Sequence, residues 1–467
     1  MNVGLSNAIY LSAVAETRRL NRYTLLTRAI LAASLLSSPL WLAALFFTSP
    51  EDYSYATSLV FVPLVGLGCT LMFTFVWRED RPLRALLGAG VLFRLAAASV
   101  YIWVGYVIYN SAVDSFHYWD VGLQLANDFA MTGWSVFKPP YWSSNLISNI
   151  CGLLSLVIGD ALPTLFVIFA LASLWGSYFF YRAFRIAFPN GDHRLYGLLV
   201  IFFPSIAFWS SAIGKDALEQ LFIGLSAYGF ARLIQRPGFR ASLICIAGIA
   251  GAILSRPHVG AIVTLACLLP YTLAGTRGHW MRVSAKILIV PVLLLATVYL
   301  AVAAGNFVGM EAGDAEITLQ RVDQITKSTQ IGGSAFNAEQ SLPARIAMAP
   351  FLMFRPLPWE VHSPMAAIAF LEAFALLIFC VKRRNEFKAA LRRCRTPYIA
   401  FILIFSAEFS LAFAATVSNF GILVRQRIML LPLMLMLFCA NLSKSGSVSV
   451  AAGAPRGVAS LMQRTEP

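Results

Sequence analysis

The apolar residues of this chain fall in repeated blocks of roughly 18 to 25, and this spacing constrains the fold more than any other feature. A helix of about 20 residues crosses the hydrocarbon core of a bilayer. Of the 467 residues, 58% are hydrophobic and only 12% are charged, whereas a soluble domain carries about 25% charged residues. Strands of a membrane barrel would alternate apolar and polar residues over about 10 positions. The sequence therefore predicts an all-α, polytopic membrane protein.

We predict about twelve membrane-spanning helices, all within one transmembrane domain that covers residues 29–441. The predicted spans are residues 29–48, 57–77, 86–109, 162–182, 195–212, 217–234, 241–255, 259–275, 284–304, 365–381, 397–416 and 424–441. Residues 1–28 precede them as a short cytoplasmic segment. Residues 442–467 are rich in Ser, Gly and Ala and are expected to form a disordered cytoplasmic tail.

The distribution of positive charge predicts the orientation of the chain. Lys and Arg number 36 and Asp and Glu number 22, giving a net charge of +14. Most of the basic residues lie in short segments that face the cytoplasm if the N-terminus is inside, with the densest group in residues 382–395. An even number of spans then places both termini in the cytoplasm. No basic run is interleaved with aromatic residues, so nucleic acid is not an expected partner.

Two long segments are expected on the outer side of the membrane, residues 110–161 and 305–364. The first contains a predicted amphipathic helix from about residue 115, with Asp120 on its polar face and Trp119 on its apolar face. Such a helix should lie flat in the membrane interface. The apolar run that follows is about 14 residues long and too short to cross, so we expect a second interfacial or re-entrant helix there.

Asp114 precedes Tyr118 by four residues and directly follows the third predicted span. A carboxylate at the membrane surface can act as a general base toward a hydroxyl group when nearby cations and a low dielectric tune it. The alternative is a helix N-cap, in which the carboxylate accepts hydrogen bonds from free backbone N–H groups. Asp120 fits a solvated helix face as well as a catalytic role.

Several basic residues lie on the outer side of the membrane, where the orientation rule disfavours them. These outer residues, together with one histidine, are Lys215, Arg256, His258, Arg345, Arg355, Arg425 and Arg427. If their side chains converge, they form an anion site at headgroup depth, because arginine binds phosphate oxygens in pairs and lysine supplies a point charge. The alternative is that each side chain reaches lipid headgroups independently.

Four ionisable residues fall within apolar blocks: Arg94, Glu219, Glu372 and Glu408. Such groups are costly in a membrane and usually face the interior of the helix bundle. They form either a path for protons or substrate or a structural ion pair, such as Arg94 with one of the glutamates. We favour the structural interpretation. The seven cysteines lie singly, without the Cys-x-x-Cys spacing, so we expect neither a disulfide nor a zinc site.

Several sequence features occur together in one order. The Asp114 and Tyr118 pair is followed by the two flat helices, and further motifs come after them: YFFYRAFRIAFPNGDHRLYG, FFPSIAFWSSAIGKDAL, FRPLPWE and NFGILVRQRIMLLP. From about residue 86 onward, this arrangement resembles the GT-C membrane glycosyltransferases of bacterial envelope and exopolysaccharide pathways. Members of this family use polyprenyl-phosphate-linked sugars.

The resemblance implies a GT-C-like fold in the bacterial inner membrane and an inverting transfer of sugar at the periplasmic face. The donor would be a polyprenyl-phosphate-linked sugar, and the acceptor a hydroxyl of a glycan or lipid-linked molecule. By the family pattern, Asp114 is the general base, with Asp120 as the substitute candidate. The substrate-binding set implied by position is Tyr118, Lys215, Arg256, His258, Arg345, Arg355, Arg425 and Arg427. No metal or other cofactor is expected, because Arg and Lys alone can neutralise a monophosphate leaving group.

Two other functions remain open at this stage. A glycan polymerase or an enzyme of the O-antigen ligase type also works outside on lipid-linked sugars, but it uses a pyrophosphate donor. A flippase for lipid-linked oligosaccharides, or another transporter, would instead place polar groups along its spans and break paired helices. The chain has few ionisable residues within its spans and no evident internal repeat.

Overall fold

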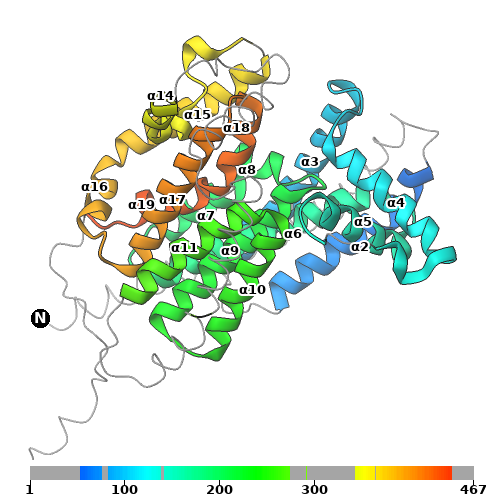
Figure 1. Cartoon of the computed structure of the whole chain (residues 1–467), viewed down its shortest axis with the longest axis horizontal. Helices are drawn as coiled ribbons and strands as arrows, with labels where there is room; N and C mark the ends of the chain where they lie inside the picture. The colour runs from blue at the N-terminus through cyan, green and yellow to red at the C-terminus, as the bar shows by residue number, and fades with distance from the viewer. Residues whose placement is uncertain are drawn as a thin grey trace, which may run out of the picture.

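The computed structural model describes residues 53–75, 83–137, 141–273, 342–362 and 364–443, together with residue 291. In this part of the chain the regular elements are all helices (Figure 1). The first eleven are α2 (Tyr53–Phe75), α3 (Arg84–Val107), α4 (Asp114–Thr132), η2 (Gly133–Val136), α5 (Ser144–Ile158), α6 (Leu162–Ala187), α7 (His193–Phe202), α8 (Pro204–Trp209), α9 (Lys215–Gln235), α10 (Phe239–Ser255) and α11 (Pro257–Leu273). The rest are α14 (Leu342–Ala347), η3 (Ala349–Phe354), η4 (Pro358–Glu360), α15 (Pro364–Lys382), α16 (Arg384–Arg392), α17 (Pro397–Thr416), α18 (Phe420–Gln426), η5 (Arg427–Met429) and α19 (Leu431–Cys439).

Three of these helices, α3, α6 and α17, are long and apolar enough to cross a membrane. The segments Phe420–Met429 and Leu431–Cys439 make a fourth if they form one span, with a bend of 56° between them. The all-helical character of the membrane protein is therefore confirmed for the described residues. The number of twelve spans and the GT-C-like arrangement remain predictions. The predicted spans 29–48 and 284–304 and both terminal segments lie outside the described residues, apart from residues 291, 442 and 443.

Close packing of α6, α9 and α10 forms the centre of the helix bundle (Figure 1). A Cβ atom on Gly176 of α6 would lie 2.1 Å from the backbone oxygen of Gln220 on α9. One on Gly224 would lie 2.4 Å from the backbone oxygen of Gly176, and one on Gly248 of α10 would lie 2.4 Å from the Ser226 nitrogen. Side chains at these positions would force the helices apart. Small residues thus let the backbones approach closely, as is common between membrane helices.

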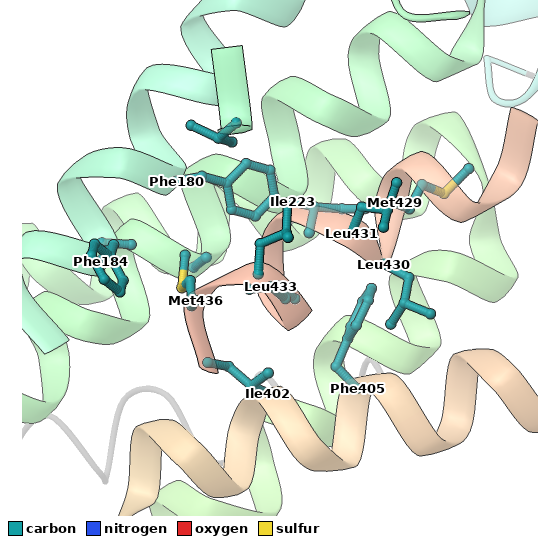
Figure 2. Close-up of a cluster of buried hydrophobic side chains, with 14 of the residues drawn as sticks. Phe180, Phe184, Ile223, Ile402, Phe405, Met429, Leu430, Leu431, Leu433 and Met436 are labelled. Carbon is teal, nitrogen blue, oxygen red and sulfur yellow. The ribbon is translucent and has the colours of Figure 1, made fainter. Parts of the chain in front are cut away.

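A cluster of buried apolar side chains fixes the last helix of the bundle (Figure 2). Figure 2 shows α19, with Leu433 and Met436, lying between Phe180 of α6 and Ile402 of α17. All four side chains are fully buried. Because α19 directly follows α18 and η5, this packing also fixes the segment that carries Arg425 and Arg427.

The two helices predicted in the first outer segment are present. The amphipathic helix α4 begins at Asp114, and its face carrying Phe116 is buried while Asp120 is exposed, as the residue pattern predicted. The apolar run that was too short to cross the membrane forms α5.

The prediction of one continuous span over residues 195–212 is wrong, because the chain breaks into α7 and α8 at Phe203. Phe203 is extended, with ψ of 123°, and it precedes Pro204. Proline lacks an N–H group and disfavours helical backbone at the residue before it, so the helix ends here and restarts at Pro204. The segment after α8 is therefore a loop, and it leads directly to Lys215.

Candidate functional site

Four segments that are far apart in the sequence each present a charged side chain to one place. Asp114 is the first residue of α4, and the preceding turn contains Asn110 and Ser111 with φ of 47° and 64°. Lys215 and Asp216 begin α9. Arg256 is the single residue between α10 and α11, and Arg425 lies in α18. Each functional side chain therefore lies at or near a helix end.

Arg425 and Asp216 link these residues into a chain of ion pairs. Arg425 donates from Nε to Asp216 Oδ2 and from Nη1 to Asp114 Oδ2, the latter at 3.1 Å. Arg256 donates from Nη2 to Asp216 Oδ1 at 2.8 Å. We call Asp114, Lys215, Asp216, Arg256 and Arg425 the outer charge cluster.

The two carboxylates of the outer charge cluster differ in their access to solvent. The Asp216 side chain is 5% exposed and holds two guanidinium groups, whereas the Asp114 side chain is 60% exposed and contacts only one. Asp216 is therefore suited to hold the arginines in place. Asp114 is suited to meet a molecule from outside, because its second carboxylate oxygen has no partner among the described residues.

Lys215 is held in place by Ser143, the residue before α5, which in turn contacts α10. Its Nζ donates to Ser143 Oγ at 3.0 Å, and the Ser143 backbone N–H donates to the Leu254 oxygen at 2.8 Å. This arrangement fixes Lys215 beside the end of α10, next to Arg256. Within the described residues Lys215 forms no ion pair, so its positive charge is available to an anion.

The electrostatics of the outer charge cluster favour an anion. It holds three cations against two carboxylates, which leaves a positive excess. Burial and the nearby Arg256 guanidinium lower the pKa of the Lys215 ammonium from its ordinary value of 10.5. Burial alone would raise the pKa of Asp216, but Arg425 and Arg256 outweigh it and hold that pKa below 3.8. A bound phosphate would relieve the repulsion among the cations.

Tyr118 and His258 lie at the edge of the cluster. Tyr118 is buried, and its ring packs against the turn at Gly214, where an added Cβ would lie 4.0 Å from Cε2. Burial raises the pKa of the Tyr118 hydroxyl, which hydrogen bonds with Ser144. His258 is the second residue of α11 and follows Arg256 by two positions, with its ring centroid 6.4 Å from that of Phe413.

Two other predicted phosphate ligands, Arg427 and Arg355, are not part of this cluster. Arg427 is 2% exposed and donates from Nη2 to Glu372 at 2.7 Å and from Nη1 to the Arg355 oxygen at 3.0 Å. The Arg355 side chain is in turn held by Glu360 and lies 5.0 Å over the ring of Phe420. These placements give both arginines contacts within the protein, and their role as phosphate ligands stays a prediction.

Asp120 is not brought into the cluster either. Asp120 is exposed on α4 and accepts a hydrogen bond from Gln124 at 3.0 Å, with no contact to the cluster, which disfavours it as the substitute base. The side chain of Arg345 lies outside the described part of the structure.

The expected ion pair between Arg94 and a glutamate is not formed. The Arg94 guanidinium is fully buried and donates to the backbone oxygens of Ile206 and Ala207, both at 3.0 Å. Glu372 pairs with Arg427 and accepts from the Ser205 N–H at 2.9 Å. Arg94 and Glu372 therefore both hold α8, the short helix before Lys215, and their role is structural.

Sequence reasoning missed two members of the site. Asp216 bridges two arginines, and Gln426 accepts from Arg256 Nη1 at 3.2 Å. The sequence offered one signal for Asp216. A carboxylate is favoured in the first turn of a helix, and this one directly follows Lys215, a basic residue on the side of the membrane where the orientation rule disfavours it. No local signal marks Gln426, whose contact joins residues 170 positions apart.

No family model, curated protein or solved structure matches this chain. The case for a function therefore rests on the chemistry of the outer charge cluster, because function is argued from a site and not from a helical fold alone.

Proposed function

We propose that this chain is an inverting membrane glycosyltransferase that moves a sugar from a polyprenyl-phosphate donor to a hydroxyl of a glycan or lipid-linked acceptor. One observation carries the proposal. Asp114, Lys215, Arg256 and Arg425 come from four separate segments, and they meet in one cluster in which Asp114 is exposed. One accessible carboxylate beside a positive excess is the combination that such a transfer needs.

In the proposed reaction the acceptor oxygen attacks C1 of the donor sugar while the bond between C1 and the phosphate oxygen breaks. Asp114 takes the proton from the acceptor hydroxyl, and the phosphate departs with the bonding electrons. Lys215 and Arg425 neutralise the charge that builds up on the phosphate. A single displacement of this kind inverts the configuration at C1. Arg425 contacts both Asp114 and Asp216, so a phosphate bound by Arg425 would lie close to the base.

Asp216 supports this chemistry by fixing the arginines before the substrate arrives. It is buried and accepts from both Arg425 and Arg256, which leaves other guanidinium N–H groups free to donate to an anion. Donors held in place by the protein need little reorganisation during the reaction, and this is a large source of rate enhancement.

A small apolar pocket lies next to the cluster. It lies between η3, α17 and α18, and it is lined by Leu352, Phe409, Phe413 and Leu423 together with Gln426. Gln426 also accepts from Arg256. Through Gln426, these apolar side chains lie next to Arg256 of the cluster.

The test is a transfer assay on the purified chain with a polyprenyl-phosphate sugar. We expect Asp114→Asn to lose turnover by about 100-fold or more, the size of a general-base contribution, while it still binds the donor. Asp120→Asn is the matched control, because it makes the same change on the same helix away from the cluster. Unchanged turnover of Asp114→Asn, or equal loss in the control, would remove Asp114 as the base.

The second candidate is a polymerase or ligase that uses a pyrophosphate donor. The three cations of the outer charge cluster favour it, since they match a more highly charged leaving group. Giving the enzyme monophosphate and pyrophosphate donors of the same sugar separates the two functions. Turnover with the pyrophosphate donor alone would replace the first proposal with the second.

A further inference from the structure

The short helix α16 carries an exposed basic face that has no part in the outer charge cluster. It connects α15 to α17, one of the helices able to cross a membrane. Figure 1 shows α16 at the opposite end of the molecule from α4 and α5. Arg384, Lys388 and Arg392 follow one another at intervals of four residues, so they lie on one side of the helix. All three are exposed.

Packing fixes which face of α16 points outward. On the opposite side Phe387 stacks on Phe438 of α19, with ring centroids 5.4 Å apart and planes at 10°. Ala390 is fully buried there. The basic face therefore cannot turn inward without breaking the contact with α19.

No acidic residue in the described part of the chain pairs with this face. Glu386 is the one acidic residue between Lys382 and Arg395, and it is buried on the packed side. Its carboxylate accepts from the backbone N–H of Ser443 at 3.0 Å and from the Ser443 hydroxyl. Within the described residues, Arg384, Lys388 and Arg392 have no ion-pair partner.

We propose that the exposed basic face of α16 is a binding site for anionic phospholipid headgroups. Because α16 connects the ends of the apolar helices α15 and α17, we expect it to lie where apolar segments meet water. Leu391 lies among the cations and is 47% exposed, which suits contact with acyl chains. Basic side chains beside a membrane helix each gain about 1 kcal/mol from an anionic surface. A free phosphate ion would lack the apolar contact.

The test measures lipid binding to the full-length chain in neutral detergent micelles by native mass spectrometry. We expect phosphatidylglycerol to bind more tightly than phosphatidylcholine. The combined variant Arg384→Gln, Lys388→Gln, Arg392→Gln should bind phosphatidylglycerol about 100-fold more weakly, at about fivefold for each cation removed. Excess inorganic phosphate should not compete with the lipid.

Two variants control for fold and for net charge. The exchange Arg384→Lys, Lys388→Arg, Arg392→Lys keeps every charge and should keep the binding. Replacing the exposed Arg194, Arg236 and Arg240 by glutamine removes the same net charge elsewhere. This variant should keep most of the phosphatidylglycerol binding. Any of four results would overturn the proposal. They are equal binding of the two lipids, unchanged binding by the glutamine variant, an equal loss in the second control, and displacement of the lipid by free phosphate. Sugar transfer is measured separately, so the two proposals fail independently.

Discussion

Among single residues, Arg425 makes the contacts that depend most on the shape of its side chain. Its guanidinium contacts two carboxylates on different helices, Asp216 through Nε and Asp114 through Nη1. A planar group with several N–H donors can do this, whereas the ammonium of lysine is a single point charge. The identity of this side chain therefore matters as well as its charge.

We expect Arg425→Lys to lower turnover in the transfer assay about 10- to 100-fold, the effect of losing one hydrogen bond to a charged group. The charge is kept, but one of the two carboxylates loses its partner. Arg240→Lys is the matched control, because Arg240 is exposed at the start of α10, away from the cluster. Turnover equal to that of the unmodified chain would show that Arg425 acts by charge alone.

Lys215 gives a prediction about pH. Its pKa is lowered by burial and by Arg256, so the ammonium loses its proton at lower pH than an ordinary lysine. A protonated Lys215 attracts the phosphate and a neutral one does not, so affinity for polyprenyl phosphate should fall with rising pH in the alkaline range below the ordinary lysine value of 10.5. The phosphate itself is already fully ionised in that range.

Lys215→Arg provides the comparison for this titration. Arginine stays protonated throughout, so the affinity of this variant should remain constant with pH. Binding measured by equilibrium titration checks both curves. Parallel curves for the two proteins would mean that a group other than Lys215 titrates.

The sequence singled out side chains by their predicted side of the membrane, and four of them, Asp114, Lys215, Arg256 and Arg425, lie together in the structure. It could not separate these from Arg427, which has the same charge two residues later but is buried against Glu372. That difference depends on which way the short turn η5 faces, and long-range packing of α19 decides it. Such long-range packing cannot be predicted from the local sequence.

Among the elements, the crossing of α6 and α9 is the most sensitive to added volume. Gly176→Ala should lower the melting temperature of the purified chain, because overpacking a tight contact costs about 1 to 3 kcal/mol. The added Cβ would meet the Gln220 backbone at 2.1 Å, which cannot move as a side chain does. Gly66→Ala on α2 is the control, since nothing lies within 4 Å of its Cβ. Similar melting temperatures for both variants would contradict this packing.

A second element-scale prediction concerns the ion pair that joins η5 to α15 and α8. Arg427→Met should destabilise the chain by about 3 to 5 kcal/mol, because it leaves Glu372 half-buried without its cation. The double variant with Glu372→Gln should recover part of this loss. Unfolding of the single and double variants in detergent gives the comparison, and strictly additive losses would argue against a direct pair.

The extent of each element followed from sequence where its periodicity is simple. The alternation of faces from about residue 115 onward was sufficient to predict a helix there, and the structure gives it as α4, Asp114–Thr132. It was not sufficient at residues 424–441, where the chain bends by 56° between two short helical segments. The segments on both sides of that bend are apolar, so hydropathy alone predicts a single span.

At the scale of the whole molecule, every proposal about the outer charge cluster depends on which side of the membrane it faces, and the thiols can report this. All seven cysteines are free, and Cys394 alone is exposed. Cys394 follows α16 in the basic segment predicted to be cytoplasmic. Asn127 is exposed on α4, the helix that begins with Asp114, so Asn127→Cys in a Cys394→Ser background reports the other side.

In sealed spheroplasts, a membrane-impermeant maleimide should label Asn127→Cys at once and Cys394 only after the membrane is permeabilised. The orientation rule requires this, because moving the basic segment outward would place its dense positive charge on the disfavoured side. The buried cysteines serve as internal controls and should stay unlabelled in the folded chain. Labelling of Cys394 in intact spheroplasts would put Asp114 on the cytoplasmic side, where a periplasmic acceptor cannot reach it.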